Sequence, residues 1–527
     1  MTSLRLILIP ILTIVVSPVL LSAQNDSASF TPSPQIGHPN NLLLERLQYK
    51  SGSLFRNDFV RDYSPFDSRS IRLESEPSLR DEILYRSTSP EKELTYTLSD
   101  QTSSVTFIPL LGVQLSHLGL GHALSKRSDG IAVTGQFGPN IVFYGKAIEN
   151  ILRGGNPDML NSLSGQPGYV ESRSYGDLGF DYDDTEMQLG FKFGKAQLFI
   201  EKIRNTWGYG RGGSIVLSDR APSYPQLRLS VQILDNLKYT MLVGDIYSGL
   251  LDSTRSYEDY TDGSYSHFRR VFRQKYLMAH VFEFSPLQQL NLAWGEEMVV
   301  SDRFAPEYLL PLVFYHTLGV QSDFLDNYNM WGGARYTFSS YGSLYTNVYV
   351  DDFDAAQGKT YVAATIGGTL VDVAQRNIDV TAEYTFLRPF VYINDVTASI
   401  RTSDGYELGN WLGQNADMIA IWVDYRPLPQ LWLTGSFEKI RKGLEPAIAM
   451  KYAGAPQPGG FLDGPLFSRH EIGLRCRYEI IPGLFADASY RLITQSDDVP
   501  NRYESFANRS FAALAIKLNI FDWNDEW

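Results

Sequence analysis

The feature that most constrains this chain is a period-two alternation of apolar and polar residues, repeated in stretches of about ten residues after residue 103. Between 470 and 480, one face carries Ile472, Leu474, Cys476, Tyr478 and Ile480, and the other carries the charges Glu471, Arg475, Arg477 and Glu479. Strands of soluble β-sandwiches usually span about 5 or 6 residues, whereas a strand that crosses a bilayer needs about 9–11. The pattern therefore predicts membrane-spanning strands whose charged face lines the inside of a barrel.

The lengths of the connections support the same fold, because outer-membrane barrels alternate short periplasmic turns with long external loops. Short turns are expected at 138–140, 194–195, 235–236, 285–288, 339–342, 374–376, 426–429 and 481–483. Long polar segments are expected at 204–225, 249–270, 301–327, 352–359, 388–415, 441–466 and 496–507. We therefore predict an all-β, antiparallel transmembrane outer-membrane β-barrel of about 18 strands over residues 103–521, with both chain ends on the periplasmic side.

The residues before the barrel differ in texture. Residues 1–23 resemble a signal peptide, with Arg5 before an apolar stretch and the small residues Ser22 and Ala23 at the expected cleavage point. Because Leu21 stands where a smaller residue is usual, an uncleaved membrane anchor is the alternative. Residues 24–102 are predicted to be a periplasmic, partly helical segment, with a mostly disordered leader as the alternative. A short periplasmic tail, 522–527, would follow the barrel. The predicted location is the outer membrane, after cleavage of the signal peptide.

Composition and motifs argue against several functions. The formal net charge is −13 and there is no basic run, which argues against nucleic-acid binding. A single cysteine, Cys476, excludes an internal disulfide. The histidines are scattered, and no His-Glu-x-x-His, Gly-x-Ser-x-Gly or phosphate-cradling motif occurs, so we expect neither catalysis nor a cofactor. The acidic residues Asp351, Asp352 and Asp354 could imitate a metal site, but a solvated loop cluster is the favoured interpretation.

A glycine-rich motif carries the most specific signal. The residues are Trp207, Gly208, Tyr209, Gly210, Arg211, Gly212 and Gly213, continuing to Pro222. A backbone bend at a barrel rim would explain them without function. The motif resembles the signature of the capsule assembly outer-membrane proteins, the Wzi family, as do the stretches 276–284, 306–311 and 351–353, although Tyr209 stands where that family often has proline. The resemblance implies an eighteen-stranded barrel with a periplasmic helical element, which helps attach capsular polysaccharide without catalysis.

Candidate polysaccharide contacts lie in two of the long segments. Sugar rings bind to aromatic faces and to carboxylates, and the residues that match this chemistry are Tyr257, Asp259, Tyr260, Asp262, Tyr265 and Trp411. Ordinary solvated loop residues are the competing interpretation. The expected partners are outer-membrane lipid and lipopolysaccharide, surface polysaccharide and the barrel-assembly machinery. The alternative function is a porin-like or polysaccharide-export channel that conducts through the polar interior.

Overall fold

The computed structural model describes residues 59–60, 94–117, 123–154, 165–259, 267–310, 313–321, 326–338, 342–354, 359–428, 430–446, 460–499 and 509–520. The signal peptide, most of the predicted helical segment and the tail 522–527 lie outside these residues. Among the described helices, none is long and apolar enough to cross a membrane.

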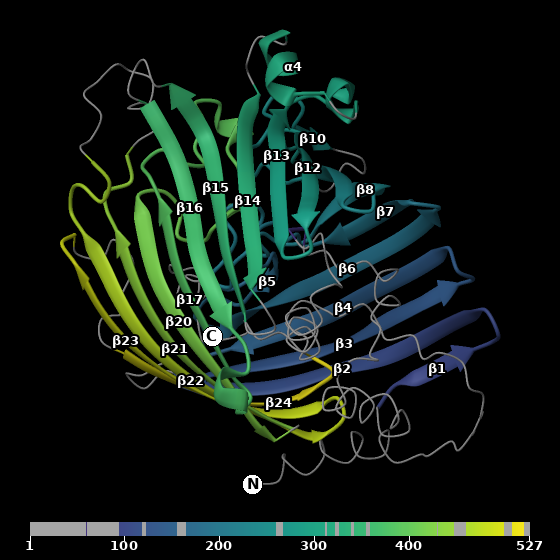
Figure 1. Ribbon diagram of the computed structural model, residues 1–527, viewed down its shortest axis with the longest axis vertical. Helices are drawn as coiled ribbons and strands as arrows, with labels where there is room; N and C mark the ends of the chain where they lie inside the picture. Colours follow the sequence, from purple (N-terminus) through teal and green to yellow (C-terminus); the bar gives the residue numbers. More distant parts are fainter. Residues whose placement is uncertain are drawn as a thin grey trace. The chain divides into compact units, whose positions relative to one another are not determined.

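The strands form one antiparallel sheet of 20, of which eighteen close into a barrel while β1 and β5 are short additions (Figure 1). The eighteen are β2 Ser103–His117, β3 Ala123–Phe137, β4 Ile141–Arg153, β6 Gly179–Phe193, β7 Ala196–Ile203, β8 Tyr224–Leu234, β9 Leu237–Asp245, β12 Lys275–Leu287, β13 Leu290–Ser301, β14 Asn327–Phe338, β15 Gly342–Asp354, β16 Lys359–Leu370, β17 Ile378–Leu387, β20 Ala416–Leu428, β21 Leu431–Lys442, β22 Phe467–Ile481, β23 Leu484–Asp497 and β24 Arg509–Leu518. The predicted eighteen-stranded barrel is confirmed.

Short elements decorate the sheet and its connections. The additional strands are β1 Tyr96–Ser99, β5 Glu171–Ser174, β10 Tyr257–Asp259, β11 His267–Arg269, β18 Thr402–Ser403 and β19 Tyr406–Glu407. The helices are α4 Tyr315–Gln321 and the 3-10 turns η5 Gly176–Leu178, η6 Pro306–Leu309, η8 Val373–Gln375 and η9 Thr397–Ser399. Every one of these helices lies in a connection rather than in the wall.

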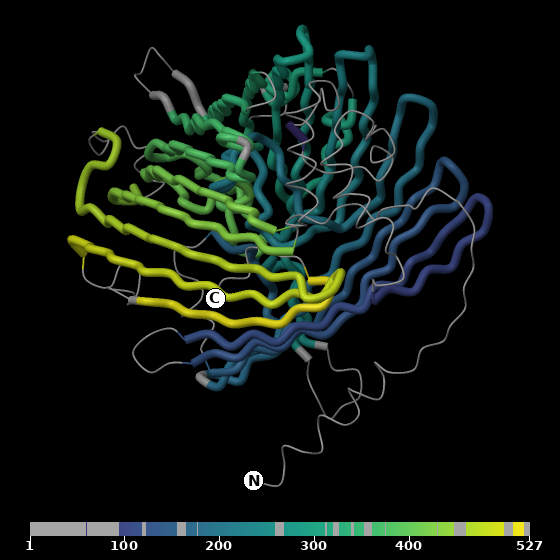
Figure 2. Tube along the Cα trace, turned by 60° about the horizontal axis from the view of Figure 1, so that its bottom comes forward, coloured from purple at the N-terminus to yellow at the C-terminus, as the bar shows by residue number. Residues whose placement is uncertain are grey.

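The barrel closes where β24 pairs with β2, from Leu111 opposite Leu518 to His117 opposite Ala512. Figure 2 shows this seam, with the yellow C-terminal strands beside the purple first strands. Nearer the start of β2, residues 104–107 of the same edge pair with β1. Between the two partners, Asn519 donates its side-chain amide to the Pro109 carbonyl at 2.9 Å. The seam therefore leaves few backbone groups of β2 without a partner, as a strand edge in lipid requires.

The C-terminal strand ends earlier than the alternation predicts. Asn519 has a φ of 54°, in the left-handed region, and this turns the chain out of the ladder. Continued alternation would place Ile520 on the lipid-facing side with Leu514 and Ile516. Instead it is 4% exposed and packs inside the barrel against Ile108. Beyond the turn at Asn519, the period of two no longer applies.

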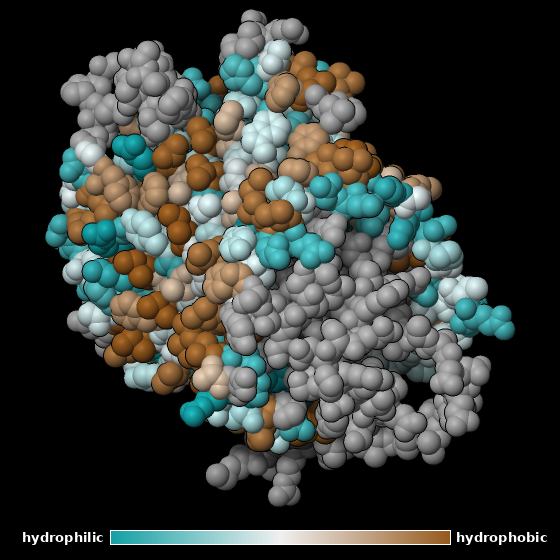
Figure 3. Space-filling view, in the orientation of Figure 1, coloured by the Kyte–Doolittle hydropathy of each residue, from teal (hydrophilic) through white to brown (hydrophobic). Residues whose placement is uncertain are grey.

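The two faces of the wall differ as the alternation predicts. Outward-facing Leu115, Met187, Leu474 and Leu514 are more than 60% exposed, which is the environment of a lipid-facing side chain. The inward residues of β22 are buried or half-buried, and Arg477 is 0% exposed. Figure 3 shows the hydrophobic residues in brown over the strands at the left of the view.

Tight turns gather at one end of the barrel and long connections at the other, which we call the short-turn end and the long-connection end. Two of the predicted short turns, 285–288 and 426–429, begin later in the structure, because β12 extends to Leu287 and β20 to Leu428. Pro286 and Pro427 are inside the last residues of β12 and β20, at shifts in the strand register. Proline has no N–H to donate, so it fits a strand only where the ladder skips a bond. These prolines therefore sit at bulges, one step before the turns.

Replacing Leu474 with arginine tests the assignment of the two faces. The outward side chain meets lipid, so the substitution is expected to lower the free energy of unfolding by about 2–4 kcal/mol near the bilayer midplane. The control is Ser436→Arg, because Ser436 points inward opposite Gly473 and has Glu438 two residues away. The measurement is urea unfolding of the barrel in liposomes. Equal losses in the two variants would contradict the assignment.

Candidate functional site

The glycine-rich motif lies inside the barrel, in the connection 204–223 between β7 and β8. Its backbone pairs with itself, since the Trp207 N–H donates to the Leu217 carbonyl at 2.9 Å. Trp207 is fully buried and Tyr209 nearly so. At the tip, Gly213 has a φ of 103°, and a Cβ there would lie 2.9 Å from the Trp411 ring. The motif is thus an inward-folded hairpin, and its glycines permit the bend and the close contact.

Polar side chains on the wall bind the backbone of this hairpin. The Asn347 amide accepts from the Tyr209 N–H at 2.9 Å and donates to the Tyr209 carbonyl at 2.7 Å. The Glu383 carboxylate accepts from the N–H groups of Arg211 and Gly212, the second at 2.9 Å. It also accepts from the Tyr345 hydroxyl. Inward side chains of β15 and β17 therefore make the hydrogen bonds that water would make to an exposed turn, because buried polar groups need partners.

A second connection, 388–415 between β17 and β20, carries a fully buried charge. Arg401 forms a two-pronged ion pair with Glu297 of β13, including a 3.0 Å bond from Nη2 to Oε2, and both side chains are 0% exposed. Nη2 of Arg401 also donates to the Val216 carbonyl, and the Tyr349 hydroxyl donates to Glu297 at 3.0 Å. One guanidinium thus joins the wall and both connections.

Further contacts interlock the two connections, which we call the interior loop pair (204–223 and 388–415). The Asn410 amide donates to the Gly213 carbonyl at 2.7 Å, and the Trp411 indole N–H donates to the Gly212 carbonyl at 2.9 Å. The Tyr392 hydroxyl donates to the Ile215 carbonyl at 2.6 Å. In the other direction, the Ser218 N–H donates to the Leu408 carbonyl at 2.8 Å, so the pair forms one packed unit within the barrel.

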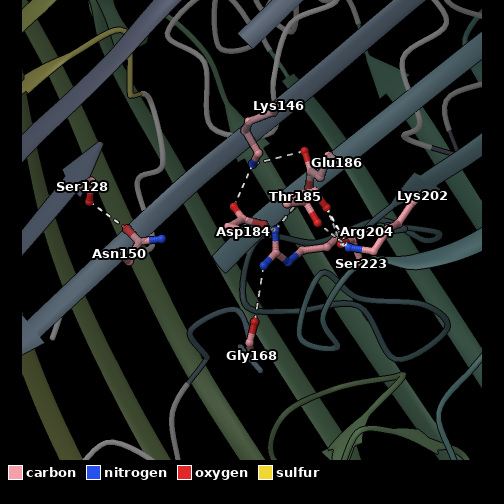
Figure 4. A network of polar contacts seen from close by, with 10 residues as sticks. All are labelled: Ser128, Lys146, Asn150, Gly168, Asp184, Thr185, Glu186, Lys202, Arg204 and Ser223. Atoms are coloured by element: carbon pink, nitrogen blue, oxygen red, sulfur yellow. Dashed lines mark hydrogen bonds and ion pairs between the residues drawn. The ribbon is translucent and has the colours of Figure 1, made fainter. Parts of the chain in front are cut away.

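Polar contacts also fix both ends of the first loop to the wall (Figure 4). Arg204 contacts Asp184 at 2.9 Å and Glu186 at 3.2 Å, and Lys146 of β4 reaches the same two carboxylates. At the other end of the loop, Ser223 accepts from Lys202 at 3.0 Å. The two cations and two carboxylates of the first group balance in charge. This arrangement is suited to holding the loop rather than to binding an ion.

A short stretch from the N-terminal segment also reaches the interior. Phe59 is 0% exposed, its N–H donates to Glu283 at 2.8 Å, and its carbonyl accepts from the Gly208 N–H at 2.8 Å. Val60 forms a backbone bridge with Trp207. Residues that lie far apart in sequence therefore converge on the glycine-rich motif.

The predicted motif residues are therefore interior structural residues. Trp207, Gly208, Gly210 and Gly213 build the hairpin, and the Arg211 guanidinium lies over the Trp422 ring at 5.3 Å. In β22, the side chains of Glu471, Arg475, Arg477 and Glu479 face the interior, where Arg477 pairs with Asp487 at 2.6 Å and Glu471 with Arg491 at 3.3 Å. The charges of Arg477 and Glu471 are therefore compensated within the wall.

The predicted sugar contacts are not gathered into one described cluster. Tyr257 is 55% exposed on β10, and Asp259 ends the same strand, but its side chain is not described. Tyr260, Asp262 and Tyr265 lie outside the described residues. Trp411 is half-buried against the core of the interior loop pair, with the Arg469 guanidinium 5.8 Å from its ring. Its indole N–H is already used by Gly212, so a ligand would meet only the ring.

Sequence reasoning did not identify the residues that hold the interior together, above all Glu297, Arg401 and Asn347. One signal was available, because the adjacent carboxylates Glu296 and Glu297 interrupt the alternation of β13. Within the described part of the chain, no group of three or more His, Cys, Asp or Glu residues is placed to hold a metal ion. The arrangement is therefore a scaffold of fixed charges.

Replacing Arg401 with methionine should leave Glu297 as an unpaired buried charge and lower the free energy of unfolding by about 3–5 kcal/mol. Adding Glu297→Leu should recover much of that loss, because the uncompensated carboxylate is removed. The control is Arg273→Met, which breaks a pair whose side chains are 42% and 43% exposed and should cost about 0–1 kcal/mol. Urea unfolding in liposomes gives all three values, and similar losses for Arg401→Met and Arg273→Met would refute the assigned role.

Glu407 in β19 makes stability depend on pH. Burial raises the pKa of its carboxyl from 4.5 to about 7, although Arg401 and Lys442 oppose the shift. Between these values the folded protein keeps a proton that the unfolded chain has released, so stability should fall as pH rises from about 4.5 to 7. Glu445 also raises the pKa and Lys275 lowers it. The test compares the free energy of unfolding at pH 5 with that at pH 8. Glu407→Gln should reduce the difference between the two values. An unchanged difference would contradict the role assigned to Glu407.

Comparisons with known proteins support the fold. Neither a protein-family model nor a curated protein matches the chain. Among solved structures, it is similar to Wzi of Escherichia coli, described as a carbohydrate-binding β-barrel involved in group 1 capsule assembly, with a TM-score of 0.55 and 12% identity over 91% of this chain and 98% of that one.

Two outer-membrane proteins align less closely. OccAB2 of Acinetobacter baumannii has a TM-score of 0.44 and 13% identity, over 79% of this chain and 97% of that one. OprD of Pseudomonas aeruginosa has a TM-score of 0.42 and 11% identity, over 79% and 92%. The similarity to Wzi shows that the chain has the fold of a closed outer-membrane β-barrel, which supports an outer-membrane location.

Proposed function

We propose that this chain is a non-enzymatic outer-membrane protein that helps assemble or attach surface polysaccharide, of the capsular or exopolysaccharide kind. The observation that carries the proposal is the interior loop pair, which is fixed inside the barrel by the buried Arg401–Glu297 pair. A barrel whose own chain occupies its interior is suited to holding a ligand at one end rather than to passing solutes. The proposal therefore assigns binding to the long-connection end.

Two further observations support a carbohydrate ligand. The interior hairpin is built from the residues that resemble the Wzi family's signature, and the fold is similar to that of Wzi, a carbohydrate-binding barrel. The candidate contact residues also lie in long connections, where exposed loops carried on a rigid scaffold commonly bind ligands. Tyr257 presents an exposed ring and Trp411 a half-buried one, which suits stacking against sugar rings.

The second candidate function is a porin-like or polysaccharide-export channel. The observation that favours it is the row of charged residues that faces the interior from β22, above all Arg475 and Arg477. A polar interior wall is also what a filled barrel needs in order to bind its own loops. The ion pair between Arg477 and Asp487 favours a filled barrel over a channel, because the charges of the pair are already compensated.

Replacing Tyr257, Tyr260 and Tyr265 together with alanine tests the polysaccharide role. If each ring contributes about 0.5–1.5 kcal/mol, their loss should weaken binding roughly tenfold or more. The measurement is the cell-bound fraction of surface polysaccharide at matched levels of folded barrel. Barrel assembly should be unaffected, because exposed loop tips tolerate substitution.

The matched control is Tyr336→Ala. Tyr336 is 48% exposed, yet it lies near the short-turn end of β14, away from the long connections. It should leave the bound fraction unchanged. If the triple variant also retains all of its polysaccharide, the loop 249–270 is not the binding surface. A further unchanged result for Trp411→Ala would contradict the proposed function.

A further inference from the structure

One long connection lies against the outside of the barrel. It joins β13 to β14, and we call its described residues, 302–310 and 313–321, the flap. Three of its residues, Ala305, Tyr308 and Tyr315, are fully buried in a cluster with Met278, Met298 and Val300 of the wall. Figure 1 shows the helix of the flap, α4, beside β13 and β14.

The wall residues under the flap face away from the interior. In β13, Glu297 and Val299 point inward, because Glu297 binds Arg401 and Val299 belongs to the interior cluster. Their neighbours Glu296, Met298 and Val300 therefore point outward. Outward residues of a barrel normally meet lipid, yet these three are at most 1% exposed. The flap covers them.

Glu296 explains why the cover is attached at this point. An ionised carboxylate on the lipid face has no water to solvate it and is costly unless it is hydrogen-bonded. Glu296 accepts from the Tyr315 N–H at 2.7 Å and also from the His316 backbone and the Tyr328 hydroxyl. The backbone donors belong to the first turn of α4, so the wall carboxylate anchors the flap.

The flap reaches a part of the outer wall that faces lipid. Its residue Phe314 lies with its ring centroid 5.8 Å from that of Trp294. Strand β13 begins at Leu290, immediately after a short turn, and Trp294 is its fifth residue. The Trp294 side chain is 37% exposed. The flap therefore extends from the long-connection end toward the middle of the wall, rather than standing away from the barrel.

Three large apolar side chains are exposed on the outer surface of the flap. Phe304, Leu310 and Phe314 are 47%, 53% and 58% exposed, and their surface continues into that of the lipid-facing Trp294. Among the described residues of the flap, the guanidinium of Arg303 is paired with Glu307 at 2.6 Å and Asp326 at 2.8 Å. The polar residues His316 and Thr317 are also exposed. The three large apolar side chains fit acyl chains better than a charged headgroup.

We propose that the flap is embedded in the outer leaflet, where Phe304, Leu310 and Phe314 bind lipid acyl chains while Glu296 holds the flap to the wall. This inference rests on the barrel fold and is independent of the polysaccharide role. By covering Glu296, the flap gives this part of the outer wall a lipid-compatible surface. It also gives the barrel a broader hydrophobic contact over β12 to β14.

The test places a fluorescent probe on the flap. Phe314→Cys is made in a Cys476→Ser background, labelled with an environment-sensitive fluorophore and reconstituted into liposomes. Brominated phosphatidylcholine should remove most of the fluorescence, while aqueous iodide should have little effect. Leu474→Cys is the lipid-facing control and Tyr257→Cys is the water-exposed control. Iodide quenching equal to that at Tyr257, without quenching by brominated lipid, would overturn the proposal.

A second copy of the chain is the other possible occupant. In that case, brominated lipid would quench the probe at 314 less as the protein-to-lipid ratio rises, and Phe314→Cys would form disulfide-linked dimers. Either result would overturn acyl-chain binding. Quenching by brominated lipid that is independent of protein density would support it.

A substitution at Glu296 tests the anchor. Glu296→Leu removes the acceptor for the backbone of α4, so the probe at 314 should become accessible to iodide. Glu296→Gln keeps an acceptor oxygen and should preserve quenching by brominated lipid. If Glu296→Leu leaves both quenching values unchanged, Glu296 does not hold the flap.

Discussion

Backbone hydrogen bonding in the absence of water is the constraint on which the rest of this structure depends. A strand edge in hydrocarbon has no solvent partner, so the first and last strands have to pair. Here β2 pairs with β24, and β1 continues the same edge below it. At the junction, Asn519 supplies a donor to the carbonyl of Pro109. Once the sheet is closed, every strand has one face toward lipid and one toward an enclosed interior.

Closure also encloses charged side chains on the inward face of the wall, away from bulk water. The interior loop pair supplies partners for these charges. Glu297 is compensated by Arg401 of one loop, and Glu383 binds backbone groups of the other. In turn, the wall provides acceptors for loop N–H groups that would otherwise be unpaired. The same rule operates outside the barrel, where Glu296 is satisfied by the first turn of α4.

Much of the fold was predictable because it depends on local pattern. The alternation in β22 is a property of neighbouring residues, and short and long connections can be read along the chain. The prediction was wrong where one residue leaves the pattern, as at Asn519, whose left-handed φ directs Ile520 inward.

The interior could not be predicted in the same way. Arg401 and Glu297 are 104 residues apart, and their meeting depends on how the closed wall curves around two folded loops. The motif at Trp207 indicated that the loop is special, but its position inside the barrel follows from partners on β15 and β17. The candidate sugar contacts stay predictions, since most of their side chains lie outside the described residues.

We propose that the interior loop pair blocks the barrel and that the protein binds a ligand rather than conducts solutes. The most direct measurement is the conductance of the purified protein in planar lipid bilayers. Because the loops lie inside the barrel, the protein is expected to insert without producing a steady large conductance. A stable open channel in the unmodified protein would contradict the proposal, because the Arg401–Glu297 pair and the interior loop pair would then not seal the barrel.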